Sequence, residues 1–344
     1  MRIERLAASL DEPLLVTSGA NVWYLTGLRS SNAALLVEPD ASATVYADFR
    51  YAQKARAVRG VTFVETSRYL FVSLAELLAG RRLAFEESNL TVAAHRTLTE
   101  GGIDLTPTTG LVEALRRVKD DDEIATMREA AALSDSMFEA LVKEPFVGRS
   151  ERELAWWIER TFREAGADLV WPPIVAAGLN GASPHADPGE RVIERDTLVT
   201  VDAGCVVKGY YSDCTRTFTT GDPPQELLDA YELCLQAQLA GLEAVRAWVP
   251  GVDADGASRE PIEDAGLGSA YGHGLGHGVG IELHEAPVLR PESTDVLEAG
   301  NMVTVEPGIY LPGVGGVRIE DLVLVTEDGC ERLTQFPKEL IAVG

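Results

Sequence analysis

The sequence GHGLGHGVGIELH occupies residues 272–284. It contains three histidines, His273, His277 and His284, set among five glycines, in a chain with only five histidines in all. A single histidine is usually a core or surface group, but three within twelve residues are poorly explained in that way. Glycine lets backbone segments approach closely at a cost in conformational order, so its concentration beside imidazoles predicts a crowded functional site.

Two carboxylates precede this segment. Asp202 ends a short apolar run, and Asp213 lies in the next strand-like run, residues 211–219. The dipeptide Lys208-Gly209 between them is typical of a hairpin turn. We therefore expect an antiparallel hairpin that brings Asp202 and Asp213 to one place.

Two further carboxylates follow the histidine segment in a similar arrangement. Glu306 follows the apolar residues 302–305, and Glu320 follows residues 317–319, across a connection rich in proline and glycine. A carboxylate at the end of a hydrophobic strand is partly buried and needs a partner or a metal ion. One such residue is usually a surface strand end, but four on two hairpins, with histidines between them, predict a metal site.

The types of ligand narrow the choice of metal. A site rich in carboxylate oxygens with one imidazole suits Mn²⁺, Co²⁺, Fe²⁺ or Zn²⁺ rather than a thiolate-bound structural zinc. Four carboxylates carry too much negative charge for one divalent ion and match two ions, roughly 3.5–4 Å apart. We therefore expect two divalent metal ions per chain, with Mn²⁺ or Co²⁺ favoured and Zn²⁺ or Fe²⁺ as alternatives.

The rest of the chain indicates two domains. The first 119 residues alternate between strand-like and helix-like runs without a catalytic constellation, which predicts a small α/β domain, with strands at 33–37 and 43–47 and helices at 48–59, 73–78 and 91–98. The charged residues 119–123 precede a long helical stretch, so we place the boundary there, giving domains 1–119 and 120–344. Further helices are expected at 123–141, at 150–165 (with a Ser150–Glu153 capping box) and at 225–249.

Charge and composition exclude several classes of function. Residues 1–119 carry 14 Lys and Arg against 13 Asp and Glu, a net charge of +1, and residues 120–344 carry the remaining 16 against 41, a net charge of −25. The acidic second part disfavours nucleic acids and anionic membranes as partners. No apolar run is long enough to span a membrane and the first residues lack a signal-peptide core, so we expect a cytoplasmic protein.

Other common motifs are missing from the sequence. The four cysteines form no CxxC pair, which predicts buried, reduced thiols rather than disulfides or a thiolate metal site. There is no GxxxxGK[ST] phosphate-binding loop, no GxSxG elbow around Ser183 and no GxGxxG fingerprint. His284 and Glu285 lack the second histidine that an HExxH zinc site requires.

The motifs resemble those of the pita-bread metallopeptidases, which include methionine aminopeptidase, aminopeptidase P and prolidase. The resemblance covers roughly residues 120–340 and is carried, in the order of that family, by SPH at 183–185, VDAG at 201–204, YSDCTRT at 211–217, GLGHG at 274–278, VEPGIY at 305–310 and GVRIED at 316–321. The segments YLTG at 24–27 and DFRY at 48–51 resemble the creatinase-type N-terminal domain of the proline-directed branch. The implied fold is α+β, with a C-terminal pita-bread domain and a smaller α/β N-terminal domain.

The resemblance also implies roles for individual residues. The metal ligands would be five side chains: Asp202, Asp213, His277, Glu306 and Glu320. His185 and His284 would steady the tetrahedral intermediate and relay protons, while Glu306 would also handle the proton of the attacking water. His273 and Arg318 would line the pocket near the far end of the substrate.

The implied activity is hydrolysis of the peptide bond that precedes proline, in a homodimer. The compact length favours a prolidase, which acts on Xaa-Pro dipeptides, over an aminopeptidase P, which acts on longer peptides. A creatinase-like hydrolase and a non-enzymatic binding protein remain as alternatives, although the retention of all five ligand types argues against both.

Arg50 is the last candidate site residue. A dipeptidase must recognise the carboxylate of the substrate's proline, and the planar guanidinium of an arginine suits a carboxylate. The second domain, at a net charge of −25, would repel that carboxylate unless a cation were placed for it. We therefore expect Arg50, supplied by the N-terminal domain of the same or a partner subunit, to bind the substrate.

Overall fold

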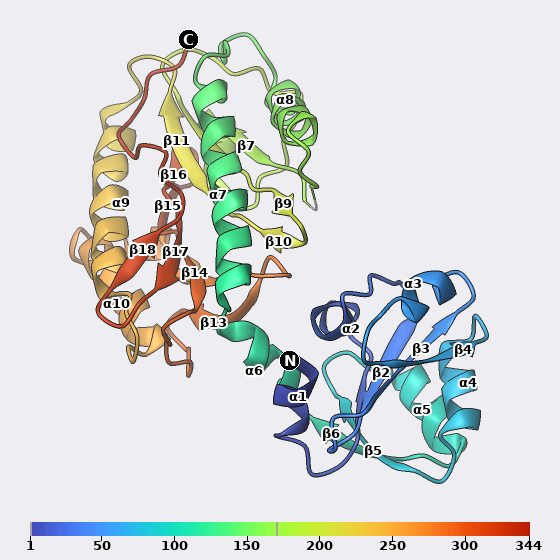
Figure 1. Cartoon of the computed structure of the whole chain (residues 1–344). Helices are drawn as coiled ribbons and strands as arrows, with labels where there is room; N and C mark the ends of the chain where they lie inside the picture. Colours follow the sequence, from blue (N-terminus) through green and yellow to red (C-terminus); the bar gives the residue numbers. More distant parts are fainter. Residues whose placement is uncertain (1, 170) are drawn as a thin grey trace. The chain divides into compact units, whose positions relative to one another are not determined.

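The computed structural model describes residues 2–169 and 171–344 and divides the chain into two compact units, Met1–Arg116 and Arg117–Gly344 (Figure 1). The sequence placed this division slightly later, after residue 119. The backbone before Lys119 belongs with the second unit because it bonds there: Lys119 N donates to Gly300 O at 2.9 Å, and Asn301 Nδ2 donates to Arg117 O at 3.1 Å.

The first unit is a six-stranded mixed sheet with short helices between its strands. The sheet order is β4-β3-β2-β1-β5-β6, with antiparallel pairs in the middle and parallel pairs toward both edges. Its strands are β1 (Leu14–Val16), β2 (Ala33–Val37), β3 (Ala43–Asp48), β4 (Thr62–Thr66), β5 (Arg82–Glu86) and β6 (Asp104–Thr108). Its helices are α1 (Arg2–Ala7), α2 (Gly19–Thr26), α3 (Ala52–Arg56), α4 (Leu70–Leu77), α5 (Val92–Glu100) and α6 (Leu111–Arg117).

The expected strands at 33–37 and 43–47 are confirmed, but the helix expected at 48–59 is shorter than predicted at both ends. Asp48 still belongs to β3, and α3 covers only Ala52–Arg56. The reason is local, because the buried carboxylate of Asp48 accepts hydrogen bonds from both the backbone and the side chain of Arg50. Such side-chain bonds to nearby backbone compete with helix formation.

The second unit begins with two helices and a three-stranded antiparallel sheet, β11-β8-β7. The elements are α7 (Asp121–Leu141), α8 (Glu151–Glu164), β7 (Ile174–Ala177), the 3₁₀ helix η1 (Gly178–Ala182), β8 (Leu198–Asp202) and β11 (Thr215–Thr219). A small hairpin of β9 (Val206–Val207) and β10 (Tyr210–Tyr211) is inserted between β8 and β11. Its turn residues, Lys208 and Gly209, both have positive φ, as the expected hairpin turn requires.

The rest of the second unit repeats this plan. Two helices, α9 (Gln225–Ala244) and α10 (Gly251–Asp264), come before the five-stranded sheet β13-β12-β14-β17-β18. The strands are β12 (Gly276–Gly278), β13 (Glu285–Leu289), β14 (Met302–Val305), β17 (Asp321–Val325) and β18 (Cys330–Arg332), with the 3₁₀ helix η2 (Gly268–Ala270) before them. A second small hairpin, β15 (Gly308–Leu311) and β16 (Gly315–Arg318), is inserted between β14 and β17.

The helices of the second unit lie on the outside of these sheets (Figure 1). The capping box predicted at Ser150 and Glu153 is confirmed, and Asp120 and Glu123 form another at the start of α7. The helix expected at 225–249 is wrong at its end, because α9 stops at Ala244 and a separate helix, α10, starts at Gly251.

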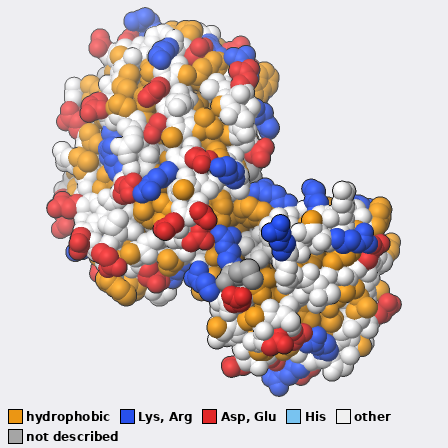
Figure 2. Space-filling view, viewed as in Figure 1, with side chains coloured by type: hydrophobic (Ala, Val, Ile, Leu, Met, Phe, Trp, Pro, Cys, Tyr) orange, Lys and Arg blue, Asp and Glu red, His pale blue; other side chains and the backbone are white. Residues whose placement is uncertain are grey.

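Aromatic side chains fill the core between α7, α8 and the first sheet. Phe138, Phe162 and Phe218 are each at most 1% exposed there. The four cysteines are free, three of them buried, and burial raises the pKa of each thiol, as expected for unreactive thiols. On the face of the second unit seen in Figure 2, acidic side chains are spread among basic and apolar ones rather than gathered in one place.

Candidate active site

Each half of the second unit presents two carboxylates in equivalent places. In the first half, Asp202 ends the central strand β8, and Asp213 lies just before the returning strand β11, whose first residue, Thr215, pairs with Asp202. In the second half, Glu306 follows β14 and Glu320 precedes β17. The expected hairpins are therefore present, and each brings its two carboxylates together.

The two halves are joined where the returning strands begin. Glu320 N donates to Thr215 O at 3.1 Å. Arg216, which is 2% exposed, forms an ion pair of 2.8 Å with the buried Asp321 on the other half. Because these contacts fix β11 beside β17, the carboxylates of both halves face one another.

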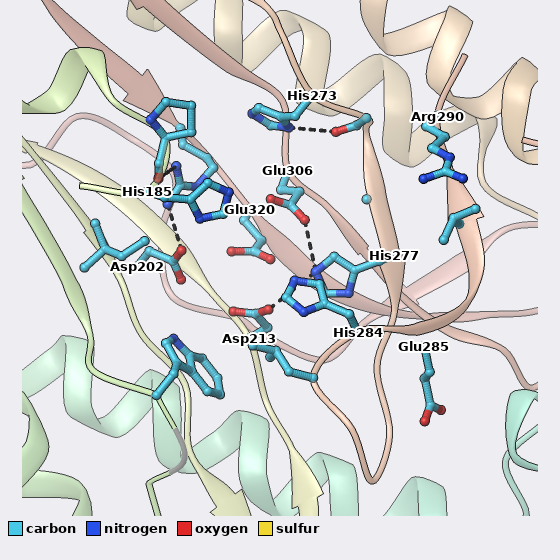
Figure 3. Close-up of a pocket in the computed structure, with 18 residues that line it drawn as sticks. His185, Asp202, Asp213, His273, His277, His284, Glu285, Arg290, Glu306 and Glu320 are labelled. Atoms are coloured by element: carbon cyan, nitrogen blue, oxygen red, sulfur yellow. Dashed lines mark hydrogen bonds and ion pairs between the residues drawn. The ribbon is translucent and has the colours of Figure 1, made fainter. Parts of the chain in front are cut away.

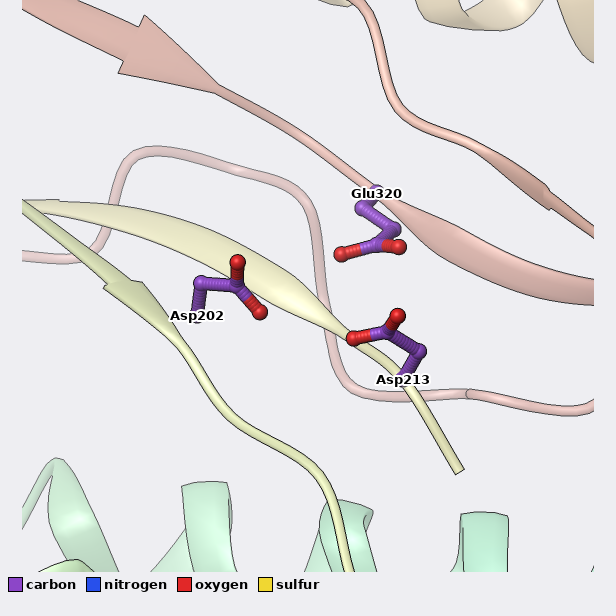
Figure 4. A group of neighbouring side chains, drawn as sticks. All are labelled: Asp202, Asp213 and Glu320. Carbon is purple, nitrogen blue, oxygen red and sulfur yellow. The ribbon is translucent and has the colours of Figure 1, made fainter. Parts of the chain in front are cut away.

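Three carboxylates meet at the centre of this arrangement. One oxygen from each of Asp202, Asp213 and Glu320 lies within 4.8 Å of the others, and Figure 4 shows the three side chains pointing toward one another. Asp213 and Glu320 are 6% and 1% exposed. Such close, buried negative charges require a cation or protons.

His277 and Glu306 adjoin this group from the other side (Figure 3). His277 Nε2 lies 3.3 Å from Glu306 Oε1 and 3.8 Å from Asp213 Oδ2. The glycines that flank His277 allow the strands to pack this tightly, because a Cβ at Gly276 would lie 2.1 Å from Thr304 O and one at Gly278 would lie 2.4 Å from Ala286 O. The close packing predicted from the glycines of residues 272–284 is therefore confirmed.

Neighbouring side chains orient three of the carboxylates. Arg318 Nη2 donates to Asp202 Oδ2 at 2.7 Å. Two threonine hydroxyls do the same for the glutamates: Thr215 donates to Glu320 Oε2 at 2.7 Å, and Thr304 donates to Glu306 Oε1 at 2.9 Å. Groups of this kind fix the direction in which a carboxylate presents its remaining oxygen.

The protonation of the cluster reflects its surplus of negative charge. Burial and the charge of Asp202 raise the pKa of Asp213 well above its usual range, and burial and the charge of Asp213 do the same for Glu320. Burial alone would raise the pKa of Glu306 and lower that of His277, but their mutual hydrogen bond brings Glu306 to about 2 and His277 to about 9. Glu306 and Asp202 each have a cationic partner, His277 and Arg318, whereas the two carboxylates with raised pKa values do not have one of their own among the described residues.

These residues fit a divalent cation site. Asp202 Oδ1 is buried and has no hydrogen-bond partner among the described residues, although its other oxygen is held by Arg318. An unpartnered buried carboxylate oxygen beside two carboxylates with raised pKa values is what a metal site looks like without its ion. The donor set, carboxylate oxygens with one imidazole, is that of hard or borderline divalent metals.

The five side chains line a cavity of about 450 Å³, with the three other histidines predicted for the site around it. The ring of His284 lies 4.2 Å from that of His277, and burial, with the charge of His277, lowers the pKa of His284. His185 is exposed on the loop after η1. His273 Nε2 lies 2.9 Å from the Tyr310 hydroxyl, and burial lowers the pKa of His273.

Arg318 lines the cavity, but its guanidinium is already occupied. Besides Asp202, it donates to the Tyr310 hydroxyl at 2.9 Å, to Pro184 O at 3.1 Å and to Thr215 Oγ1 at 3.1 Å. Arg50 lies in the first unit, where its guanidinium holds both oxygens of Asp48, at 2.9 and 2.7 Å. The role of Arg50 in substrate binding stays a prediction.

Sequence reasoning missed Arg290 and Trp171, which also line the cavity. Arg290 directly follows β13, two residues after Val288, which lines the cavity too. This alternation along a strand was the available signal. Arg290 forms no hydrogen bond or ion pair with the described residues, and Trp171 stacks on Tyr211 with ring centroids 5.8 Å apart.

Comparison with known proteins agrees with this geometry. The chain matches metallopeptidase family M24 over residues 125–327 and the creatinase/prolidase N-terminal domain over residues 2–118. The fold is therefore that of a metallopeptidase with a creatinase N-terminal domain and a pita-bread domain. The chain belongs to metallopeptidase family M24.

Individual relatives span the whole chain. The Bacillus subtilis protein described as uncharacterized peptidase YqhT is 37% identical over 335 residues, 95% of either chain. The structure of a Xaa-Pro dipeptidase from Bacillus anthracis is similar with a TM-score of 0.95 and 38% identity, over 99% of both chains. That of an X-Pro aminopeptidase from Thermotoga maritima is similar with a TM-score of 0.89 and 30% identity, over all of both chains.

Proposed function

We propose that this protein is a dinuclear metallopeptidase that hydrolyses the peptide bond preceding proline, and that it acts chiefly on Xaa-Pro dipeptides. The observation that carries the proposal is the convergence of His277 and four carboxylates, from two hairpins and one glycine-rich strand, in one cavity. A smaller set of acidic residues would serve a single ion, whereas four carboxylates match two.

The residues divide between the two metal positions. Asp202 would hold one ion and His277 with Glu306 the other, while Asp213 and Glu320, at the centre of the cluster, would contact both. Bound divalent ions would polarise the scissile carbonyl and lower the pKa of water. Mn²⁺ or Co²⁺ suits this donor set best, with Zn²⁺ or Fe²⁺ as alternatives.

The remaining chemistry belongs to the side chains. Glu306 would accept the proton that the attacking water loses and then return it to the proline nitrogen. His284, whose pKa is lowered by burial, would donate one ring N–H to the developing oxyanion. His185 also lines the cavity and would assist with proton transfer.

The preference for proline follows from what the cavity offers. Proline's tertiary amide has no N–H to donate, so the site must recognise the ring by shape and by apolar contact. Apolar side chains of the lining, among them Trp171, Ile174 and Val288, supply that contact.

The preference for dipeptides rests on the cations near the cavity. Arg318 is committed to Asp202 and Tyr310, whereas Arg290 has no partner among the described residues and so can bind the carboxylate of the substrate's proline. A hydrogen bond to a charged group contributes about 1.5–3 kcal/mol. Arg50 would add a second contact from the N-terminal domain of the same subunit or of its partner in a homodimer.

Aminopeptidase P activity is the second candidate, since the solved structures with a similar fold include an X-Pro aminopeptidase. The test compares hydrolysis of an Xaa-Pro dipeptide and an Xaa-Pro-Xaa tripeptide by the same preparation, with added Mn²⁺, Co²⁺ or Zn²⁺. Faster hydrolysis of the dipeptide supports a prolidase, and faster hydrolysis of the tripeptide supports an aminopeptidase P. Hydrolysis of neither would overturn the proposed function.

A further inference from the structure

Glu151 is a buried carboxylate that lies outside the cavity and forms no ion pair among the described residues. It is the first residue of α8 and is 1% exposed. Its oxygens accept hydrogen bonds from three groups: Oε1 from Ala177 N at 2.8 Å, both oxygens from Asn180 Nδ2 at 3.0 Å, and Oε2 from Gly189 N at 3.2 Å. A buried charge satisfied only by N–H donors holds those donors in fixed positions.

The donors are the two ends of one loop. Ala177 ends β7, Gly189 lies twelve positions later, and His185 lies between them on the segment that lines the cavity. The backbone of α8 adds to the attachment, because Arg152 N donates to Gly189 O at 3.1 Å. From the inside, Arg318 holds the same loop through Pro184 O at 3.1 Å.

His185 itself has no hydrogen bond to the described residues and is exposed. The position of its imidazole is therefore determined by the backbone of the loop rather than by a partner of its own. We propose that Glu151 is the positioning residue for His185: one carboxylate ties both ends of the loop and so sets where His185 meets the substrate. This inference rests on the proposed function, in which His185 takes part in hydrolysis.

The arrangement requires a carboxylate rather than an amide. Ala177 N and Gly189 N bind different oxygens of Glu151, so a glutamine at this position can accept from only one end of the loop. The other end would meet an NH₂ group and move away. The amide of Asn180 can turn to suit either form, so it does not remove this conflict.

The test is Glu151→Gln in the full-length, metal-loaded enzyme with an Xaa-Pro dipeptide. We expect kcat to fall about tenfold or more, since a displacement of about 1 Å in a catalytic group can cost 10²-fold, with KM and metal content nearly unchanged. Glu153→Gln is the matched control, because it removes one charge from the same turn of α8, and the Glu153 carboxylate accepts hydrogen bonds from Ser150 and not from the loop. It should leave kcat within about twofold of the unsubstituted enzyme.

A double-variant cycle separates positioning from a general loss of structure. If Glu151 acts through His185, then Glu151→Gln should cost nothing further in the His185→Ala background, so the two losses will not multiply. Multiplying losses, or an unchanged kcat in Glu151→Gln alone, would overturn the proposal. Should Glu151→Gln fail to fold, Glu151→Asp keeps the charge but shortens the side chain by one methylene, so it cannot reach both Ala177 N and Gly189 N; an unchanged kcat there would also overturn the proposal.

The double-variant cycle also distinguishes failure of the positioning role of Glu151 from failure of the proposed role of His185 in hydrolysis. If His185→Ala hydrolyses the dipeptide as fast as the unsubstituted enzyme, then the proposed role of His185 fails and the positioning role fails with it. If His185→Ala is slow but Glu151→Gln is not, only the positioning role fails.

Discussion

The two halves of the catalytic unit share a backbone plan but differ in the chemistry it carries. In each half two helices precede antiparallel strands, and a small hairpin is inserted between the central and the returning strand. Each half has a carboxylate at the end of its central strand and another before or at the start of its returning strand. The difference lies in the strand that pairs with the other edge of the central one: β7 is apolar, whereas β12 carries His277 between two glycines.

The four carboxylates also differ in whether they have a cationic partner. Asp202 is held by Arg318 and Glu306 by His277, so the carboxylate on each central strand has a cation of its own. Asp213 and Glu320, just before the returning strands, have no cation of their own among the described residues, since His277 lies closer to Glu306 than to Asp213, and their pKa values are raised. The backbone plan common to both halves thus places the four carboxylates. The side chains that differ between the halves, Arg318 and His277, determine which carboxylates need a bound metal ion to balance their charge.

Glu306→Gln should give the largest effect, because it removes both a predicted metal ligand and the group that moves the proton. We expect kcat for an Xaa-Pro dipeptide to fall by about 10³-fold or more, together with a loss of metal, since a general base alone contributes 10²–10⁴-fold. Glu327→Gln, at an exposed position, is the control. Normal activity in Glu306→Gln would remove this residue from the mechanism.

The two neighbouring histidines should separate in their effects. His277→Ala should lower the metal content, because its Nε2 faces Glu306 and Asp213. His284→Ala should keep the metal and lose about 10²–10⁴-fold in kcat, as expected for an acid–base group. Metal analysis and kinetics on both variants check this. An empty site in His284→Ala with a full one in His277→Ala would reverse the assignment.

The arginines predicted to read the substrate's carboxylate should give smaller, substrate-dependent effects. Arg290→Ala and Arg50→Ala should each lower kcat/KM for a dipeptide by about tenfold, the loss of one charged hydrogen bond, while sparing a tripeptide. Arg195→Ala, at an exposed position outside the cavity, is the control. Equal losses on both substrates, or no loss on either, would show that the arginine concerned does not bind the substrate's carboxylate.

The smallest expected effect is a pH dependence of stability. Because the pKa values of Asp213 and Glu320 are raised in the folded chain, the metal-free protein binds protons more tightly than the unfolded chain, and its stability falls as the pH rises above the usual carboxylate range. Metal binding requires both groups deprotonated.

The difference in Tm between metal-loaded and metal-free protein should therefore grow from pH 5 to pH 8. Each kcal/mol that metal binding adds to the free energy of unfolding raises Tm by about 2–4 °C. Thermal unfolding at both pH values measures it. A difference that shrinks with rising pH would mean that these carboxylates do not bind the metal.

The central site could be predicted from sequence because its residues end strands whose apolar patterns are strong. The two hairpins, and with them Asp202 and Glu306, followed from those patterns and from turn residues such as Lys208-Gly209. The helix α10 could not be predicted, because Gly251 and Pro261 make its sequence a poor helix former. It is held by tertiary contacts, such as the bond from Leu275 N to Asp255.

Other features depend on the fold rather than on any local pattern. Arg290 looks like a surface arginine until β13 places it beside the cavity. Glu151 looks like an ordinary acidic residue in the first turn of a helix, because the loop that it holds begins 26 positions later in the chain. Of the common plan of the two halves, only the repeated pair of carboxylates was visible in the sequence, because the two halves share little else.

The central claim is that two metal ions, held by ligands from both halves, are required for hydrolysis. The most direct measurement follows hydrolysis of an Xaa-Pro dipeptide and metal content together, as the protein is stripped by a chelator and then titrated with Mn²⁺ or Co²⁺. We predict a loss of about 100-fold or more in rate on stripping, equivalent to several kcal/mol, and recovery that is complete at two ions per chain. Full activity in the metal-free protein would contradict the account.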